Sequence, residues 1–231
     1  MNTHGRTSQP MILPTMQGKP CAHINLSLSA VKWMQNRGDV FQNHTSNPLL
    51  DPAICSEMLQ ATHKQLGIDY SYGGWLENRA YIWRNSYLEK KKTFIHLGVD
   101  VNAPAGTPVA IDFDATVVRI DDDHDFEGGW GPRVIVRHEH VDAYIIYAHL
   151  ARDIRVMMGE GLSQGDVLGE IGQAPSNGNW YPHVHVQVMT PKAYSVAYLD
   201  NFRSLDGYGA TNKLPELKTQ FRNPMDFIQV K

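Results

Sequence analysis

The pattern of hydrophobic and polar positions divides the chain into a helical first part and a strand-rich second part. Residues 1–20 show no regular pattern and are expected to form an irregular arm. Apolar residues recur at helical spacing over 27–37, which predicts a helix there. A second helix is expected to begin after Asp51, because Asp is favoured at the N-cap and Pro52 suits the first helical position. Gly67 is expected to end it in the left-handed conformation.

From Thr93 onward the pattern changes to short β-rich runs that are separated by Gly, Pro and Asp. The predicted strands cover 107–120, 133–138, 143–149, 166–171 and 183–189. The aromatic, glycine-rich segment 70–84 is expected to form a loop followed by a strand. Together these elements predict a mainly β fold, an antiparallel sandwich or meander, with a small helical extension before it. The expected division is an arm and helical extension over 1–69 and a β domain over 70–231.

Composition restricts the classes of function. The chain has 231 residues, of which 42% are hydrophobic and 19% charged, as in ordinary globular proteins. A net charge of -3 makes a broad nucleic-acid-binding face unexpected. No stretch is long enough to span a membrane, and no basic segment followed by an apolar run marks a secretory signal. A cytoplasmic location is therefore expected, with export by a non-classical route left open, and Cys21 and Cys55 are expected to be reduced.

Histidine residues gather in three short segments of the second half. His96 precedes Asp100 by four residues, in a stretch that Gly98 marks as a strand followed by a turn. His183 and His185 are separated by one residue in a predicted strand, so their side chains point to the same face. Burying two adjacent imidazoles costs free energy unless they bind something, and the pair therefore indicates a site.

These residue types are those that bind catalytic zinc. Such a site uses three protein ligands and leaves the fourth position to water. His96, Asp100 and one histidine of the 183/185 pair supply that count, which predicts one Zn²⁺ per chain. His149 and the other histidine remain for acid–base work, because imidazole titrates near neutral pH. A second pair, His138 and His140, is expected to lie in a solvated turn.

The three segments are His96-Leu-Gly-Val-Asp100, Tyr-Ala-His149-Leu and Pro-His183-Val-His185. In this order they resemble the motif set of the lysostaphin/LytM-type zinc metallopeptidases. The run DVNAPAGTPV from Asp100 is similar to a further family motif, and the resemblance covers about residues 93–189. It implies a compact antiparallel β fold with a groove across the sheet. It also implies hydrolysis of a peptide or amide bond, with peptidoglycan cleavage as the family's usual activity.

The resemblance also implies roles for five residues. His96, Asp100 and His185 are the implied zinc ligands. His149 and His183 are the implied general base and transition-state partner, and which of them is the base stays open. The segments GGWLENRAYIW and NGNWYPHVHVQ look most similar to a branch of the family that lacks signal peptides.

Some residues depart from the family pattern and predict a reshaped groove. Gln187 stands where the family usually has Glu, and Trp180 and Tyr181 lie in the segment that replaces the usual Gly and Thr. Trp180 and Tyr181 are therefore predicted to contact substrate. Glu77 and Arg79 are further candidates for substrate binding, although a structural ion pair explains them equally well.

The expected partner is a peptide or a peptidoglycan-like polymer, with no nucleic acid and no membrane span. Two alternatives stay open. One is a cytosolic zinc hydrolase that acts on a small peptide or amide, and the other is a non-catalytic zinc-containing binding or regulatory module on the same fold. Retention of all five site residues argues against the second alternative.

Overall fold

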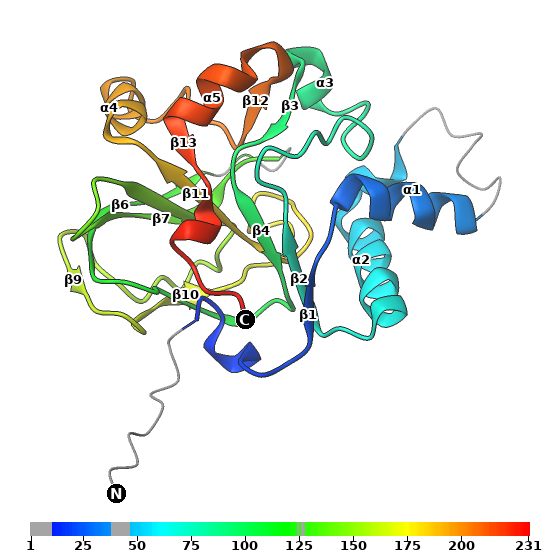
Figure 1. Ribbon diagram of the computed structural model, residues 1–231, viewed down its shortest axis with the longest axis horizontal. Coiled ribbons are helices and arrows are strands. Elements are labelled where there is room, and N and C mark those ends of the chain that lie inside the picture. The colour runs from blue at the N-terminus through cyan, green and yellow to red at the C-terminus, as the bar shows by residue number, and fades with distance from the viewer. Residues whose placement is uncertain (1–10, 38–46, 124, 126–127) are drawn as a thin grey trace, which may run out of the picture.

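The computed structural model describes residues 11–37, 47–123, 125 and 128–231, and a mixed β-sheet lies at the centre of that part of the chain (Figure 1). Its strands are β1 (Cys21–His23), β2 (Tyr70–Gly73), β4 (Val99–Asn102), β6 (Ala115–Asp123), β7 (Gly131–His138), β8 (Tyr144–Ala148), β9 (Gly161–Leu162), β11 (Val184–Met189) and β13 (Phe221–Arg222). The spatial order is β1-β2-β4-β11-β8-β7-β6-β9, and β13 pairs with β11. Only β1 and β2 pair in parallel; all other described pairs are antiparallel.

Two small antiparallel sheets accompany the main one. They pair β3 (Thr93–His96) with β12 (Tyr208–Ala210), and β5 (Pro108–Ala110) with β10 (Val167–Glu170). The first brings the end of β3 next to a segment more than a hundred residues later in the chain. This pairing positions one of the candidate metal ligands, His96.

The helices lie at the periphery of the sheet (Figure 1). They are α1 (Leu26–Asn36), α2 (Pro52–Leu66), α3 (Tyr87–Lys91), α4 (Pro191–Leu199) and α5 (Leu214–Gln220), with short 3-10 turns η1 (Pro14–Met16), η3 (Pro48–Leu50), η4 (Thr211–Lys213) and η5 (Pro224–Asp226). The Asp51 carboxylate caps α2 by accepting from the Ala53 N–H at 2.8 Å, and Gly67 ends α2 with a φ of 65°. Both predicted ends of this helix are confirmed. None of the described helices is both long and apolar enough to cross a membrane.

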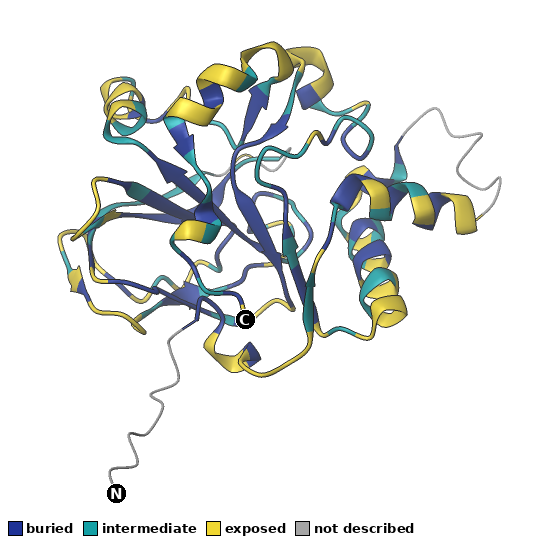
Figure 2. Ribbon diagram, in the orientation of Figure 1, coloured by how far each residue is buried: buried dark blue, intermediate teal, exposed yellow. Residues whose placement is uncertain are grey.

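The side chains of β11 alternate between two different environments. Val184, Val186 and Val188 are fully buried in a large apolar core, which we call the apolar face of the sheet. His185 and Gln187 are also buried but point to the opposite side, which we call the site face. Figure 2 shows that the central strands are buried along their length while the helices expose their outer surfaces. Polar groups buried on the site face therefore need partners within the protein.

The predicted fold class, mainly β with a helical N-terminal extension, is confirmed. Three local predictions were wrong. The run 107–120, expected as one strand, forms β5 and β6, which are separated by residues 111–114 and belong to different sheets. The stretch 70–84 forms a strand first, β2, and then a loop, because Tyr70 packs into the apolar core. Met11, Ile12 and Leu13 do not belong to an irregular arm but are buried, and Ile12 donates its N–H to the Gln229 carbonyl. Residues 1–10 of the predicted arm lie outside the described part of the chain.

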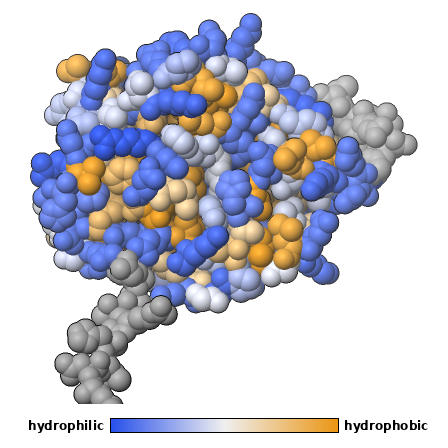
Figure 3. Space-filling view, viewed as in Figure 1, coloured by the Kyte–Doolittle hydropathy of each residue, from blue (hydrophilic) through white to orange (hydrophobic). Residues whose placement is uncertain are grey.

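The surface in view is mainly hydrophilic (Figure 3). Hydrophobic colour marks the position of α4, where Val196 and Leu199 are exposed. Both cysteines, Cys21 and Cys55, are free thiols, as predicted.

Candidate metal centre

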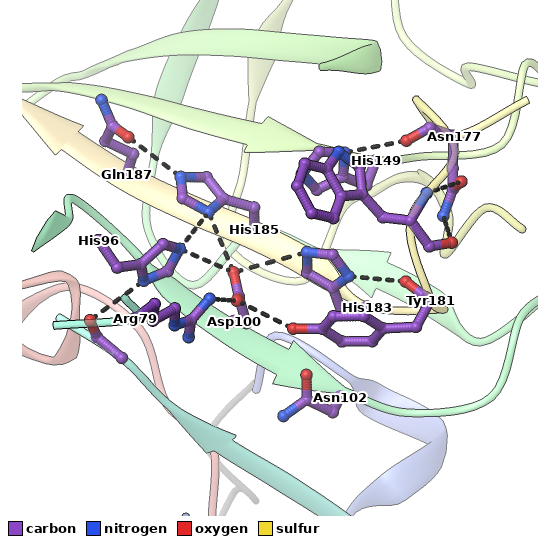
Figure 4. Close-up of polar contacts among 12 residues, drawn as sticks. Arg79, His96, Asp100, Asn102, His149, Asn177, Tyr181, His183, His185 and Gln187 are labelled. Atoms are coloured by element: carbon purple, nitrogen blue, oxygen red, sulfur yellow. Dashed lines mark hydrogen bonds and ion pairs between the residues drawn. The ribbon is translucent and has the colours of Figure 1, made fainter. Parts of the chain in front are cut away.

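Three buried side chains converge on the site face of the sheet (Figure 4). His96 is the last residue of β3, and Asp100 and His185 lie on the neighbouring strands β4 and β11. The register of these two strands places Asp100 directly opposite His185. Cross-strand neighbours on one face lie close together, so the antiparallel pairing itself brings two of the three groups into contact.

The distances between the converging atoms fit a small metal ion. His96 Nε2 lies 3.0 Å from His185 Nδ1 and 3.2 Å from Asp100 Oδ1, and His185 Nδ1 lies 3.0 Å from the same oxygen. Atoms that bind zinc at tetrahedral angles at about 2.0–2.1 Å are themselves about 3.3 Å apart. The triangle of donor atoms is thus close to one face of a zinc coordination tetrahedron.

Neighbouring groups fix which ring nitrogen carries the proton. His96 Nδ1 donates to the Gly74 carbonyl at 3.1 Å, and His185 Nε2 donates to Gln187 Oε1 at 3.0 Å. The Gln187 amide is oriented by its own donation to the Asp206 carbonyl. The two nitrogens that face each other therefore both present lone pairs, and they do so next to a carboxylate oxygen. Three electron-rich atoms in contact require a cation between them, which is the arrangement that outer partners of metal ligands produce.

The second carboxylate oxygen of Asp100, Oδ2, accepts hydrogen bonds on the side away from the candidate metal position. Asp100 Oδ2 accepts from Arg79 Nη1 at 2.5 Å and from the Tyr181 hydroxyl at 3.2 Å. Arg79 is only 2% exposed. Burial alone would raise the pKa of the Asp100 carboxyl, but His96 and Arg79 together hold that pKa well below its ordinary value. Asp100 is therefore a carboxylate with one oxygen anchored and the other directed at the candidate metal position.

Arg79 is itself fixed by residues from distant parts of the chain. It donates from Nε to Glu77 at 3.3 Å and from Nη1 to the Tyr208 hydroxyl at 3.2 Å. That hydroxyl also accepts from the indole N–H of Trp83 at 2.7 Å. Residues 77–83 and β12 thus hold the guanidinium in one position.

His149 and His183 stand next to the triangle. Each donates from Nδ1 to a backbone carbonyl, His149 to Asn177 at 2.9 Å and His183 to Tyr181 at 2.8 Å. Nε2 of each ring then has a free lone pair, and the two ring centres are 4.6 Å apart. His183 Nε2 lies 3.6 Å from Asp100 Oδ1. Both imidazoles can accept a proton beside the candidate metal position.

Three histidines of the site, His96, His149 and His183, are held in the neutral form at ordinary pH because burial lowers their pKa values. Burial, with a smaller contribution from Arg79, lowers the pKa of His96 to about 3. Burial also lowers the pKa of His183 to about 4 and holds the pKa of His149 well below its usual range. Neutral imidazole is the form that binds metal and accepts protons, so these side chains are ready for both functions.

Two glycines allow the close approach. A Cβ at Gly98 would lie 2.5 Å from the ring of His185, and one at Gly74 would lie 2.7 Å from His96 Nδ1. Gly74 also has a φ of 112°, which L side chains rarely adopt. A side chain at either position would displace a candidate ligand.

A cavity of about 710 Å³ opens in front of these groups. Its walls come from the 83–91 segment, the β6–β7 connection, residues 180–185 and residues 201–208. Of the predicted substrate contacts, Trp180 and Tyr181 line this cavity. Glu77 and Arg79 do not; they form a buried ion pair behind Asp100. The structural alternative for the Glu77–Arg79 pair is therefore the one that the geometry supports.

Sequence reasoning singled out Arg79 and Gln187 without their contacts to the metal-site residues, and it missed Tyr208 and Asn177. Gln187 follows His185 by two residues, so strand periodicity already placed both side chains on one face. Arg79, Tyr208 and Asn177 carry no such local signal, because only the tertiary fold brings them to the histidines. The pair His138 and His140 forms no metal group among the described residues: His138 stacks on Phe113, and His140 is exposed.

Part of the chain matches a known protein family. Residues 94–197 match the model of peptidase family M23. No curated protein matches the chain. Among solved structures, a prophage-encoded M23 protein, EnpA, from Enterococcus faecalis is 23% identical, with 57% of this chain and 77% of that chain covered and a TM-score of 0.39.

Two further structures are similar over parts of the chain. The catalytic domain of lysostaphin from Staphylococcus simulans is 24% identical, with 54% of this chain and 80% of that chain covered and a TM-score of 0.38. A putative peptidase M23 from Pseudomonas aeruginosa is 30% identical; the match covers 40% of this chain, spans 37% of that chain's length and has a TM-score of 0.34. Because these TM-scores are low, the family assignment rests on the sequence match.

Proposed function

From the match of residues 94–197 to the model of peptidase family M23, we propose that the chain is a zinc-dependent hydrolase that cleaves an amide bond of a peptide substrate. The observation that carries the proposal is the convergence of His96 Nε2, Asp100 Oδ1 and His185 Nδ1, each within 3.2 Å of the other two. All three side chains are buried, and the remaining polar atoms of each have a partner.

Zinc bound by these three groups supplies Lewis-acid activation of a water molecule and of the scissile carbonyl. The protein's own part in the reaction falls to His149 and His183. The first proton transfer goes from the attacking water to the Nε2 lone pair of one of these imidazoles. The protonated ring then donates its Nε2–H to the leaving amine. The other imidazole would stabilise the negative charge on the carbonyl oxygen once its own Nε2 carries a proton.

A covalent acyl intermediate is not part of this scheme. Among the described residues that line the cavity, Ser204 is the only hydroxyl or thiol of the Ser, Thr and Cys classes, and it is exposed. Among the described residues, no hydrogen bond joins Ser204 to His149 or His183, whereas a serine nucleophile needs an adjacent base. The histidines instead face the candidate metal position, as direct attack by water requires.

The substrate is a peptide, and two sources are proposed for it. Family resemblance favours the peptide part of peptidoglycan. The aromatic walls of the 710 Å³ cavity favour a short peptide, since Trp83, Trp130 and Trp180 all line it. Both sources share one chemistry, an amide bond in an extended peptide segment.

The test is metal analysis of the purified protein together with a hydrolysis screen. The screen compares purified peptidoglycan with short glycyl peptides, and His185→Ala is the inactive control. One zinc per chain with cleavage of either substrate is the expected result. Stoichiometric zinc without any cleavage would favour a non-catalytic zinc module, and absence of zinc from the wild type would overturn the proposal.

A further inference from the structure

A second cavity adjoins the one in front of the metal centre. Its volume is about 270 Å³, and it shares part of its wall with the larger cavity, including Trp83, Tyr87, Trp180 and Tyr181. The remaining wall comes from η3, the first turns of α2 and the 85–90 segment, all of which precede the family match at residue 94. We call this second cavity the side cavity.

The partition between the two cavities is held firmly. Trp83 and Trp180 meet edge to face with ring centres 5.1 Å apart. The indole N–H of Trp180 donates to the Gly129 carbonyl at 2.9 Å, and that of Trp83 donates to the Tyr208 hydroxyl. Both aromatic rings are therefore fixed by packing and by a hydrogen bond, so the side cavity is preformed.

The side cavity has apolar and aromatic side chains together with the polar side chains of Asn85, Ser86 and Asn179, and a positive charge at its rim. Leu49, Cys55 and Trp83 are each no more than 2% exposed and form its interior. Lys90 is exposed at the rim, and the described lining residues include no carboxylate. A cationic side chain would lose its hydration here, gain no anionic partner and meet a like charge. An apolar side chain would gain free energy from burial.

Size points to a side chain rather than to a whole ligand. Cavities that hold complete small ligands have about 300–1,000 Å³, a range that includes the larger cavity and lies above the side cavity. The volume of the side cavity is sufficient for one aromatic or branched aliphatic side chain. The two cavities share Trp83, Trp180 and Tyr181 in their walls, so the side cavity lies directly beside a peptide that occupies the larger cavity.

We propose that the side cavity is a specificity subsite that accepts a large, uncharged apolar side chain of the peptide substrate. The proposal rests on the proposed function for the identity of the substrate as a peptide. It also gives the helical extension a function, because η3 and α2 supply Leu49, Leu50 and Cys55 to the subsite.

The first experiment is a substrate scan with the zinc-loaded protein. The probes are acetyl-tetraglycine amide and variants with Phe, Leu or Lys at each single position, with kcat/KM measured by chromatography of the products. At one position, Phe or Leu is expected to raise kcat/KM at least about tenfold over Gly, because burial of such a side chain is worth about 1.5–3 kcal/mol. Lys at that position is expected to give no gain.

The second experiment fills the side cavity. Leu50 lines it and is 38% exposed, so Leu50→Trp adds volume there with little effect on the core. The matched control is Leu66→Trp at the other end of α2, where the leucine is 53% exposed and lines neither cavity. The ratio of kcat/KM for Phe over Gly is expected to fall toward one in Leu50→Trp and to stay high in Leu66→Trp. A thermal melt of each variant checks that it is folded.

Calorimetric binding of the same peptides separates this proposal from the proposed function. Tighter binding of the Phe peptide, weakened in Leu50→Trp, would support the subsite even if no peptide were cleaved, and the lack of cleavage would then count against the peptidase activity alone. Cleavage at equal rates whatever the side chain, with no effect of Leu50→Trp, would overturn the subsite and leave the peptidase standing. Neither binding nor cleavage of any probe would overturn both.

Discussion

Two regions of the molecule, the site face of the central sheet and the segment that follows β5, surround a buried carboxylate in opposite ways. On the site face, the buried Asp100 carboxylate has Arg79, Tyr181 and two histidines around it, and its pKa is held low. In the apolar core, Asp112 lies between Ile111 and Phe113 and receives one described hydrogen bond, from the Gln229 N–H at 2.7 Å. Burial raises the pKa of Asp112 to about 7.

The difference shows what marks a site in this fold. Burial is common to both carboxylates, and so is their position in the apolar interior of the protein. What distinguishes Asp100 is the organised set of cationic and proton-donating partners, which keeps it ionised where burial alone would neutralise it. A charge kept in the interior at such a cost indicates a functional role for the residue.

The largest effect is expected when one of the candidate metal ligands is removed. Asp100→Ala or His185→Ala leaves two donor groups and is expected to reduce bound zinc from one per chain to nearly none, with loss of activity by about a thousandfold or more. Metal analysis of the purified variants measures this. His138→Ala, which changes a histidine outside the site, is expected to retain zinc. Full zinc in the Asp100→Ala variant would mean that the triangle is not the metal centre.

The next largest effect concerns proton transfer. His149→Ala and His183→Ala keep all three ligands, so zinc content is expected to be unchanged while kcat falls by about 10²- to 10⁴-fold. Steady-state kinetics on the best peptide, with metal analysis of the same samples, tests both parts. The variant that loses more activity identifies the general base. Wild-type kcat in either variant would contradict the role assigned to that histidine.

A smaller effect on zinc affinity is expected when Arg79, which contacts the ligand Asp100, is replaced. Arg79→Gln removes the cation that anchors Asp100 Oδ2 and frees the carboxylate to rotate. Loss of such an outer partner typically weakens metal binding by about 10- to 100-fold, which a competition titration with a chelator measures. Arg84→Gln is the control, since Arg84 stacks over Tyr81 and contacts no ligand. Equal zinc affinity in both variants would show that Asp100 does not depend on Arg79.

The smallest effect concerns Asp112 and the dependence of the free energy of unfolding on pH. Because the folded-state pKa of Asp112 is raised to about 7 from an unfolded value of about 3.9, the folded protein binds the proton more tightly. This carboxyl therefore makes the free energy of unfolding decrease as the pH rises from about 4 to about 7, and the loss persists above pH 7.

Asp112→Asn removes that titration and keeps an acceptor for the Gln229 N–H. The variant is expected to be more stable than the wild type by about 1–2 kcal/mol at pH 8, and the advantage should shrink toward pH 4. Urea unfolding at several pH values measures it, with Asp114→Asn at a largely exposed position as the control. A constant difference between pH 4 and pH 8 would contradict the argument.

The candidate metal ligands and the two neighbouring histidines were easier to predict from the sequence than the residues that contact them. His96, Asp100, His149, His183 and His185 were identified from short motifs, because strand periodicity and turn signals act over a few residues. The caps of α2 were predictable for the same reason. The structure brings all five of these side chains together on one face of the sheet.

What could not be predicted depends on contacts between distant segments. Nothing near Arg79 in the sequence indicates that its guanidinium reaches Asp100 and Tyr208. The burial of Ile12 likewise depends on a partner more than two hundred residues away, at Gln229. The order of strand and loop in 70–84 was misjudged because the aromatic and glycine residues there satisfy either arrangement, and pairing with β4 decides between them.

The hydroxyl of Tyr208 joins β12 to the 79–83 segment by contacts with Arg79 and Trp83, and Arg79 extends the link to Asp100 on β4. The wall of the side cavity and the ligand strand therefore cannot open independently. Amide hydrogens around Trp83 and those of β4 are expected to exchange with solvent as one cooperative unit, and zinc should slow the exchange of both. Metal binding and the stability of the side-cavity wall are therefore expected to be thermodynamically linked.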